Sequence, residues 1–334
     1  MARIALADDG IAFDGRNAET GALGGAETAF VRLAEALAAR GHTVRAYTAG
    51  GVSLRHKDVD WAPLAEFADD APDLYVANRG HRTLDLAPRA RHIAFWLHND
   101  AAYLKKWRYL RRLWMRRPTL VFVSESHRGR APSWLPGGAR LSIPLGLEES
   151  YRREVERAPP APVAFYAANP ARGLAELAAW WPRIGGDLIA HSGTDLYAAK
   201  PRARMVMQAA LDAARAQPGI SVRPLVPRVE LIAILRAART FLYPGDPTET
   251  FCLSVAEAQA LGVPCVVMAR GALPERVRDG ETGFVAATAD AFVDAARRLM
   301  ADDDLWSRMH RACLATQRAR GWSDVAADFE GLLP

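Results

Sequence analysis

Short apolar runs alternate with segments of helical periodicity along the chain. The first run covers residues 4–7, and after a glycine-punctuated loop the apolar positions over residues 26–40 fall at helical spacing until Gly41 ends the predicted helix. Continuous apolar strands separated by helices are typical of a parallel sheet that helices cover on both faces. Further apolar runs predict strands at residues 44–48, 73–77, 92–97 and 120–123.

The alternation lapses after residue 145 and restarts at residue 163. Acidic residues at 148–149 and the prolines of 159–162 indicate a hinge and linker in this stretch. We therefore predict an N-terminal domain over residues 1–150, a C-terminal domain over 151–320 and a terminal helix over 321–334. The elements expected in the C-terminal domain are strands at 163–166, 188–191, around 222, 240–243 and 264–268, and helices from about 173 and at 202–215, 230–238 and 253–261.

The composition excludes several classes of protein. Half of the 334 residues are hydrophobic, but no apolar run approaches the ~20 residues that a membrane span needs. The opening MARIALADDG has two aspartates where a secretory signal needs an apolar core. The three cysteines, Cys252, Cys265 and Cys313, have neither a disulfide framework nor metal-ligand spacing. We expect a cytoplasmic protein without a metal site and without a nucleic-acid partner.

One segment is strongly basic. The formal net charge is +5, and residues 104–117 contain seven cations and no acid, with leucine and tryptophan recurring at helical spacing. Two interpretations are open. In the first, the apolar stripe of the helix packs on its domain and the cations are solvated. In the second, the cations and tryptophans bind an anionic membrane surface or a lipid-linked acceptor. The second interpretation predicts peripheral binding to the inner face of the cytoplasmic membrane. The residues concerned are Lys105, Lys106, Trp107, Arg108, Arg111 and Arg112.

The most informative stretch is residues 244–264. A predicted strand ends just before it and a helix begins near Leu253, so Glu249 lies in the loop and Glu257 about one turn into the helix. A carboxylate in the loop can accept hydrogen bonds from sugar hydroxyls, and one in the helix can accept both hydroxyls of a ribose. In isolation, however, such a pair would be a helix-capping acid and a solvated helix acid. The backbone N–H groups at the start of the helix can bind a diphosphate, and they are those of Thr250, Phe251, Cys252 and Leu253.

In this context the chain resembles the glycosyltransferase family 4 enzymes, which have two glutamates at the same spacing. The similarity continues through residues 261–264 and 271–284; it is tight over about 240–285 and loose elsewhere. It implies an α/β protein of the GT-B fold, in which two Rossmann-like, doubly wound parallel-sheet domains face each other across a cleft. It also implies that Glu249 holds the transferred sugar and Glu257 the ribose of a UDP-sugar or GDP-sugar.

Two features of the N-terminal half have counterparts in the family. Gly24 and Gly25 open the first helix, where glycines let the backbone approach a phosphate or sugar closely. The family has a glycine-rich loop at this place, although without a ligand the same residues form an ordinary helix-initiating turn. At the position of His98, many family members have a histidine or an acid beside the reacting sugar. The alternative is that His98 has only a structural role, as a histidine at a strand end that is bonded to the backbone. Glu27 is assigned no ligand role.

The C-terminal domain supplies a cation after its first strand. The family usually has two cations there that bind the diphosphate; Arg172 matches the second, and Asn169 stands in place of the first. Lys200 is a candidate for the missing cation, since a guanidinium or ammonium can bind phosphate. The alternative for Arg172 is a surface role alone. Residues 321–333 resemble the family's terminal helix, which crosses back onto the first domain.

The resemblance implies a retaining hexosyltransferase that moves a sugar from a nucleotide sugar to an acceptor hydroxyl. The acceptor is expected to be a glycan or lipid-linked, in the synthesis of bacterial cell-surface polysaccharide, lipopolysaccharide or glycolipid. No cofactor is expected, and a cation with a helix terminus takes the place of a metal. Two other classes remain open: a sugar-nucleotide epimerase, for which no acid/base set is found, and a non-catalytic subunit that binds a nucleotide sugar. An NAD-dependent oxidoreductase is disfavoured because the G-x-G-x-x-G fingerprint is absent.

Overall fold

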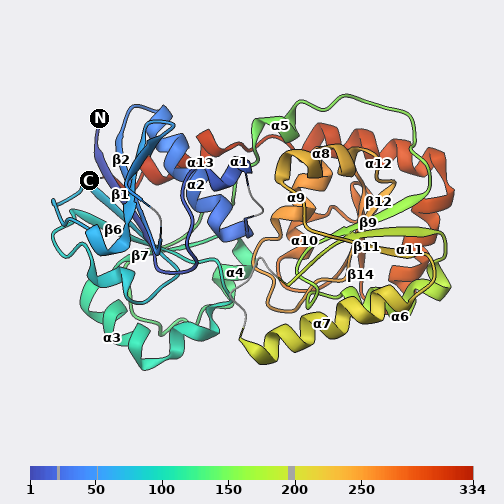
Figure 1. Ribbon diagram of the computed structural model, residues 1–334, viewed down its shortest axis with the longest axis horizontal. Coiled ribbons are helices and arrows are strands. Elements are labelled where there is room, and N and C mark those ends of the chain that lie inside the picture. The colour runs from blue at the N-terminus through green and yellow to red at the C-terminus, as the bar shows by residue number, and fades with distance from the viewer. Residues whose placement is uncertain (21–22, 51, 195–199, 334) are drawn as a thin grey trace. The chain divides into compact units, whose positions relative to one another are not determined.

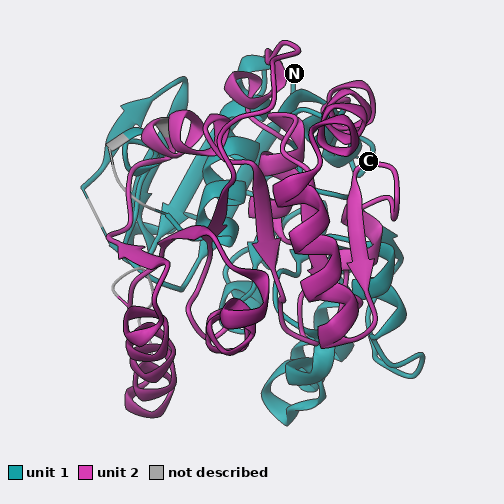
Figure 2. Cartoon of the chain, turned by 90° about the vertical axis from the view of Figure 1, so that its right-hand side faces the viewer, with its two compact units in different colours: residues 1–146, 320–334 teal, residues 147–319 magenta. Residues whose placement is uncertain are grey.

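A computed structural model describes residues 1–20, 23–50, 52–194 and 200–333 of the chain (Figure 1). The chain forms two compact units, and each is described by itself. Unit 1 comprises residues 1–146 and 320–334, and unit 2 comprises residues 147–319 (Figure 2). Among the described residues, no helix is long and apolar enough to cross a membrane.

Unit 1 is built on an eight-stranded sheet of order β3-β4-β2-β1-β5-β6-β7-β8. Neighbouring strands are parallel, apart from the antiparallel pair β3–β4. When the outermost strands β3 and β8 are left out, the order is β4-β2-β1-β5-β6-β7. This is the order of a doubly wound sheet, and the direction of winding reverses between β1 and β5. The strands are β1 (Arg3–Asp8), β2 (Thr43–Thr48), β3 (Leu54–His56), β4 (Val59–Pro63), β5 (Leu74–Asn78), β6 (His92–Trp96), β7 (Thr119–Phe122) and β8 (Arg140–Ser142).

The helices of unit 1 surround this sheet. The α2 helix has a broad buried face that packs against β2, and the last helix, α13, packs on α2 (Figure 1). Glu330, the last residue of α13, contacts the end of α2: its carboxylate accepts hydrogen bonds of 2.6 and 2.7 Å from Arg40. The helices are α1 (Asn17–Thr20), α2 (Gly25–Ala39), α3 (Trp107–Arg116), α4 (Glu125–Gly129) and α13 (Trp322–Glu330), with 3-10 turns η1 (Leu64–Glu66), η2 (Thr83–Asp85) and η3 (Ala101–Lys105).

Unit 2 has a six-stranded, fully parallel sheet of order β11-β10-β9-β12-β13-β14. Numbered within the unit this order is 3-2-1-4-5-6, the Rossmann order, and the winding reverses between β9 and β12. The strands at the centre are almost wholly buried because helices cover both faces. They are β9 (Val163–Ala167), β10 (Asp187–His191), β11 (Ile220–Arg223), β12 (Thr240–Tyr243), β13 (Cys265–Met268) and β14 (Gly283–Ala286).

The helices of unit 2 follow the strands in turn. Two of them, α8 and α9, begin on loops that leave the carboxyl ends of strands, which is where ligands bind in open α/β sheets. The helices are α5 (Glu149–Arg152), α6 (Leu174–Ile184), α7 (Pro201–Ala216), α8 (Arg228–Arg236), α9 (Leu253–Ala260), α10 (Leu273–Arg276), α11 (Ala289–Ala301) and α12 (Asp303–Thr316).

The predicted fold class is confirmed: the chain is an α/β protein with two Rossmann-like parallel sheets. The β3–β4 hairpin was not expected, because its turn has positive φ at both Lys57 and Asp58, without the glycine that usually marks such a turn. The stretch expected as a hinge contains the short helix α5 directly after the division between the units.

Candidate active site

The loop after β12 holds Glu249 at the point where the sheet of unit 2 reverses its winding. The loop turns at Asp246, whose carboxylate accepts a hydrogen bond of 2.8 Å from the amide of Thr248, while its carbonyl accepts one of 3.0 Å from the amide of Glu249. Ala272 donates to the carbonyl of Glu249, and a Cβ on Gly271 would collide with that same carbonyl. The segment from residue 271 therefore fixes the backbone of Glu249.

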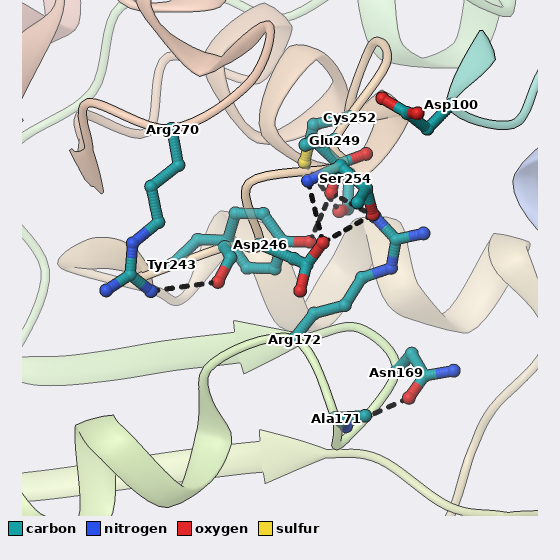
Figure 3. A network of polar contacts seen from close by, with 12 residues as sticks. Asp100, Asn169, Ala171, Arg172, Tyr243, Asp246, Glu249, Cys252, Ser254 and Arg270 are labelled. Atoms are coloured by element: carbon teal, nitrogen blue, oxygen red, sulfur yellow. Dashed lines mark hydrogen bonds and ion pairs between the residues drawn. The ribbon is translucent and has the colours of Figure 1, made fainter. Parts of the chain in front are cut away.

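The Glu249 carboxylate is the centre of a polar network (Figure 3). Its Oε2 accepts a hydrogen bond of 2.6 Å from Arg172 Nη1 and another of 2.6 Å from the Tyr243 hydroxyl. Burial raises the pKa of Tyr243 well above its usual value, so the phenol is a neutral donor. Burial alone would lower the pKa of Arg172, but the charge of Glu249 outweighs it and the pKa is raised. Arg172 and Tyr243 thus hold the Glu249 carboxylate from two sides.

Arg172 reaches Glu249 because two loops pack closely together. It precedes Gly173, which has a φ of +91° at the start of α6. A Cβ on Gly173 would lie 2.6 Å from the Cβ of Pro244, so a larger residue would separate the β9–α6 loop from the β12–α9 loop. A second guanidinium supports the β12–α9 loop: Arg270 Nη1 donates to the carbonyl of Gly245 at 3.2 Å (Figure 3).

The helix α9 begins directly after Glu249. Thr250 and Phe251 are buried in the loop, and the guanidinium of Arg276 lies 4.3 Å from the centre of the Phe251 ring. Cys252 is the N-cap in the left-handed region, with φ of 65°, and makes no side-chain capping hydrogen bond. Burial raises the pKa of its thiol to about 12, so it carries no charge. The N-terminus of α9, from Leu253, therefore retains its positive end beside the Glu249 network.

Glu257 lies on α9 and is almost fully buried. Its Oε1 forms an ion pair with Arg228, the first residue of α8. Arg228 also approaches Glu148, with 3.6 Å between its Nε and Oε1 of that residue. Sequence reasoning missed Arg228. One signal was available, since a cation in the first turn of a helix opposes the helix dipole unless an acid lies nearby.

The two other expected phosphate ligands have different surroundings. Asn169 accepts a hydrogen bond of 2.9 Å from the amide of Ala171 and so shapes the loop that carries Arg172 (Figure 3). Lys200 is the exposed N-cap of α7. Residues 195–199, directly before Lys200, lie outside the described part of the chain.

In unit 1 the glycine loop leads to an ion cluster that the sequence did not reveal. Gly24 is the N-cap of α2 and Gly25 its first residue, and a Cβ on Gly24 would collide with the carboxylate of Glu27. Glu27 accepts a hydrogen bond of 2.8 Å from Arg79, which also donates to both carboxylate oxygens of Asp8 at 2.8 and 3.0 Å. The cluster lies between the carboxyl ends of β1 and β5.

His98 follows β6 in the same unit. Its ring centre lies 4.4 Å from that of Trp96. Burial, together with the charges of Arg79 and His127, holds the pKa of His98 well below its usual value. The imidazole is therefore neutral at pH 7 and can donate one hydrogen bond and accept another.

The basic segment forms η3 and α3, and the expected apolar stripe is partly wrong. Leu104 and Leu113 are buried, but Tyr109 completes the packed face, whereas Trp107 and Trp114 are 75% and 70% exposed. The tryptophans thus lie on the solvent side with most of the cations. Arg112 and Arg116 form ion pairs with Asp85, an acid from outside the segment. The exposed cations are Lys105, Lys106, Arg108, Arg111 and Arg117.

Comparison with known proteins relates part of the chain to one family. Residues 193–302 match the family model described as glycosyl transferases group 1. The D-inositol 3-phosphate glycosyltransferase of Nocardioides sp. (strain ATCC BAA-499 / JS614) is 32% identical over 163 residues, which are 46% of this chain and 35% of the relative. The enzyme of that name from Corynebacterium glutamicum (strain R) is 35% identical over 108 residues, 32% of this chain and 26% of the relative. The matched part thus spans about a third of the length of the first relative and about a quarter of the second.

Solved structures match over the whole chain. Sucrose-phosphate synthase from Thermosynechococcus elongatus superposes with a TM-score of 0.79 at 18% identity and covers 99% of this chain and 98% of the neighbour. Anabaena Alr3699/HepE, in complex with UDP-glucose, has a TM-score of 0.73 at 14% identity, covering 99% of each chain. The resemblance to glycosyltransferase family 4 is thereby confirmed: the chain has the GT-B fold, and its residues 193–302 are related to glycosyl transferases group 1.

Proposed function

We propose that this protein is a retaining glycosyltransferase that moves a sugar from a UDP-sugar or GDP-sugar to an acceptor hydroxyl. The observation that carries the proposal is the joint position of Glu249, Arg172 and the N-terminus of α9 at the carboxyl edge of the unit 2 sheet. In this arrangement Glu249 binds the sugar of the donor. Arg172 and the α9 amides bind its diphosphate, and Glu257 binds its ribose. The UDP-glucose bound by Anabaena Alr3699/HepE supports a donor of this class.

The chemistry follows from the charges in this network. The barrier lies in separating the diphosphate from an oxocarbenium-like sugar, so the enzyme must stabilise negative charge on the leaving group. Arg172 and the α9 amides do this, while Glu249 holds the hydroxyls of the sugar. A departing phosphate oxygen takes the proton of the acceptor hydroxyl, so neither a protein nucleophile nor a metal ion is required. Asn169 and Lys200 remain candidate contacts to the diphosphate.

Unit 1 is proposed to supply contacts to the reacting sugar and the acceptor. Gly24 and Gly25 offer backbone amides at the start of α2, and His98 offers a neutral imidazole. The Glu27–Arg79–Asp8 cluster holds the first turn of α2 and the end of β5 in a fixed relation. His98 then acts as a hydrogen-bonding residue rather than as a cation.

We further propose that the acceptor is a bacterial cell-surface glycan or a lipid-linked precursor of one. The exposed cations of η3 and α3, with Trp107 and Trp114 among them, suit an anionic membrane surface. The enzyme would then work in the cytoplasm, bound reversibly to the inner face of the cytoplasmic membrane. WaaG, a glycosyltransferase involved in lipopolysaccharide biosynthesis, has a TM-score of 0.68 at 12% identity and supports a cell-surface glycan as the acceptor.

A thermal-shift screen across UDP-sugars and GDP-sugars tests the donor class. A donor at 100 times its Kd adds about 2.7 kcal/mol of stability, so the correct nucleotide sugar should raise the melting temperature clearly. NMR of the product formed with an acceptor should then show that the donor's anomeric configuration is retained. No shift with any nucleotide sugar, or an inverted product, would contradict the proposal. A product formed without an acceptor would favour the sugar-nucleotide epimerase. Binding of a nucleotide sugar without any turnover would favour the non-catalytic subunit.

A further inference from the structure

We propose that Arg228 is a positioning residue that holds the Glu257 carboxylate ready for a ribose and thereby makes the site select ribonucleotides over 2′-deoxyribonucleotides. This inference rests on the proposed function, in which Glu257 accepts hydrogen bonds from the ribose. Arg228 acts through Glu257, with which it forms an ion pair. Neither the family resemblance nor the sequence motifs assign Arg228 a role.

The burial of the pair makes Glu257 dependent on its partner. The Glu257 side chain is 4% exposed and that of Arg228 13%. An isolated carboxylate at such a depth would take up a proton or turn towards another donor. Because Arg228 compensates the charge of the carboxylate, Glu257 can accept hydrogen bonds from a ligand at its remaining lone pairs. Two adjacent ribose hydroxyls need an acceptor of this kind.

The location of Arg228 argues against a purely structural ion pair. It is the first residue of α8, directly after Pro227, where a cation opposes the helix dipole. Its Nε is buried and has no hydrogen-bond partner among the described residues, although Glu148 lies 3.6 Å away. A buried donor without a hydrogen bond is destabilising. A buried guanidinium whose Nε lacks a hydrogen bond is expected where it serves a ligand rather than stability.

The geometry also explains how Arg228 orients Glu257. The guanidinium contacts Oε1 of Glu257 from α8, while its Nε faces Glu148 at the start of α5. The guanidinium of Arg228 is therefore held from two sides. If the side chain of Glu257 rotates, Arg228 does not move with it, and the ion pair is lost. In the proposed arrangement Oε1 of Glu257 faces Arg228 and Oε2 accepts from the ligand. A lysine would keep the charge but would lose the planar two-sided contact.

The test is equilibrium binding of UDP, GDP and their 2′-deoxy counterparts to the full chain and its variants. The wild-type protein should bind the ribonucleotide of its preferred base about tenfold or more tightly than the 2′-deoxy form, the scale of one hydrogen bond to a charged group. Arg228→Met should reduce this ratio to about 2 or below, and Arg228→Lys should give an intermediate ratio. Glu257→Ala should give the same low ratio as Arg228→Met, and the double variant should lower it no further.

The matched control is Arg236→Met, which removes a different ion pair, with Glu154, from the other end of the same helix. It should keep the wild-type ratio. If Arg228→Met folds and still binds the ribonucleotide as selectively over the 2′-deoxy form as the wild type, the inference is wrong. If Arg228→Met does not fold, an unchanged selectivity in Arg228→Lys overturns the inference instead. A wild-type protein that transfers sugar but does not distinguish the two nucleotides also overturns it, while the proposed function stands. Failure of the wild type to bind either UDP or GDP would instead overturn the proposed function.

Discussion

Arg172 and Glu249 lie 77 residues apart in the sequence and are joined by a hydrogen bond of 2.6 Å between Nη1 and Oε2. Under the proposed function these two groups have separate ligands, the diphosphate and the transferred sugar. Donor binding must therefore replace their mutual contact with contacts to the substrate. The Tyr243 hydroxyl, also 2.6 Å from Oε2, can keep Glu249 in place during this exchange. The pair is thus a site whose charges are already held in position before the donor arrives.

Glu249→Gln should lower kcat by roughly 10²-fold or more, the scale of one lost transition-state contact. The amide has nearly the same shape, so the loop should fold as before, but it cannot provide a negative charge for Arg172 and Tyr243. Steady-state kinetics with the donor from the thermal-shift screen, alongside circular dichroism, measures both effects. Glu281→Gln is a control, because Glu281 is exposed and pairs with Arg278 on the surface of unit 2. Equal activity of the two variants would remove Glu249 from the catalytic site.

The sequence predicted this site where its residues are local. The strand β12, the loop and α9 are contiguous, so apolar run, turn and helix start could be recognised directly. Arg228 could not be found in this way, because its contact with Glu257 depends on how separate segments pack at the sheet edge. The contact of Tyr243 with Glu249 is local in sequence, but an apolar run does not show which of its side chains turns to the carboxylate. Cys252 was recognised as part of the helix start, but its left-handed backbone was not, since only a glycine would have signalled it.

The fold was predictable to a similar degree. Buried parallel strands leave continuous apolar runs, and most of those in both units were located from the sequence. The basic segment shows the limit of periodicity, because it predicted a helix but left open whether the tryptophans pack on the domain or face solvent, and the structure exposes both Trp107 and Trp114. Tyr109 is the buried aromatic instead. Tertiary packing decides which of several amphipathic side chains is covered, and a single helix does not contain that information.

Glu257→Ala should act mainly on donor binding. Its carboxylate is assigned to the ribose, which does not change during the reaction, so its contacts are equal in the ground state and the transition state. We expect a raised KM for the donor with kcat within a few-fold of wild type, the pattern of lost uniform binding. Initial rates over a range of donor concentrations separate the two constants. A large fall in kcat at unchanged KM would assign Glu257 to the chemistry and not to the ribose.

Activity should persist in excess EDTA. Arg172 stays protonated throughout the physiological range because the charge of Glu249 raises its pKa, and the N-terminus of α9 adds partial positive charge. Together they can stabilise the diphosphate leaving group without a metal ion. The measurement compares turnover before and after dialysis against EDTA, then with Mg²⁺ or Mn²⁺ added back. An enzyme that is silent until a divalent cation is supplied contradicts this account.

The contact of Glu330 on α13 with Arg40 and His42 at the end of α2 should depend on pH. Hydrogen bonds from Arg40 and His42 hold the pKa of Glu330 at about 2, against an ordinary value of 4.5. A lowered pKa in the folded state means that the stabilisation is complete above about pH 4.5 and is lost as the pH falls towards 2. Glu330→Gln should therefore lower the melting temperature by roughly 2 °C at pH 7, the scale of a partly exposed ion pair. The difference from wild type should shrink as the pH falls below 4.5.

The control for this experiment is Asp58→Asn. Asp58 forms an exposed, local ion pair with Arg55 within the β3–β4 hairpin, so its loss should change the melting temperature less. Thermal unfolding followed by circular dichroism at pH 7 and pH 3 compares the three proteins. A Glu330→Gln protein whose deficit is as large at pH 3 as at pH 7 would show that the carboxylate is not the source of the stabilisation.

Binding to anionic vesicles should require the exposed face of η3 and α3. Lys105, Lys106, Arg108 and Arg111 are exposed on this segment, and each cation near an anionic surface contributes about 1 kcal/mol before screening. Wild-type protein should float with vesicles containing anionic lipid at low salt and be released as salt rises. Changing these four residues to Glu should abolish flotation and leave the thermal shift with the donor intact. Arg112 is better left unchanged, because its ion pair with Asp85 stabilises unit 1.

The two tryptophans give this last experiment a second readout. Trp107 and Trp114 are mostly exposed, so replacing both with Ala should weaken the part of vesicle binding that survives high salt, without lowering stability. A control with the same change of net charge places Glu at four exposed arginines of unit 2, Arg202, Arg204, Arg297 and Arg308. If this control abolishes flotation as well, net charge and not the α3 face controls binding. If the wild-type protein stays free of anionic vesicles at low salt, the helix is ordinary surface and the acceptor must be sought among soluble glycans.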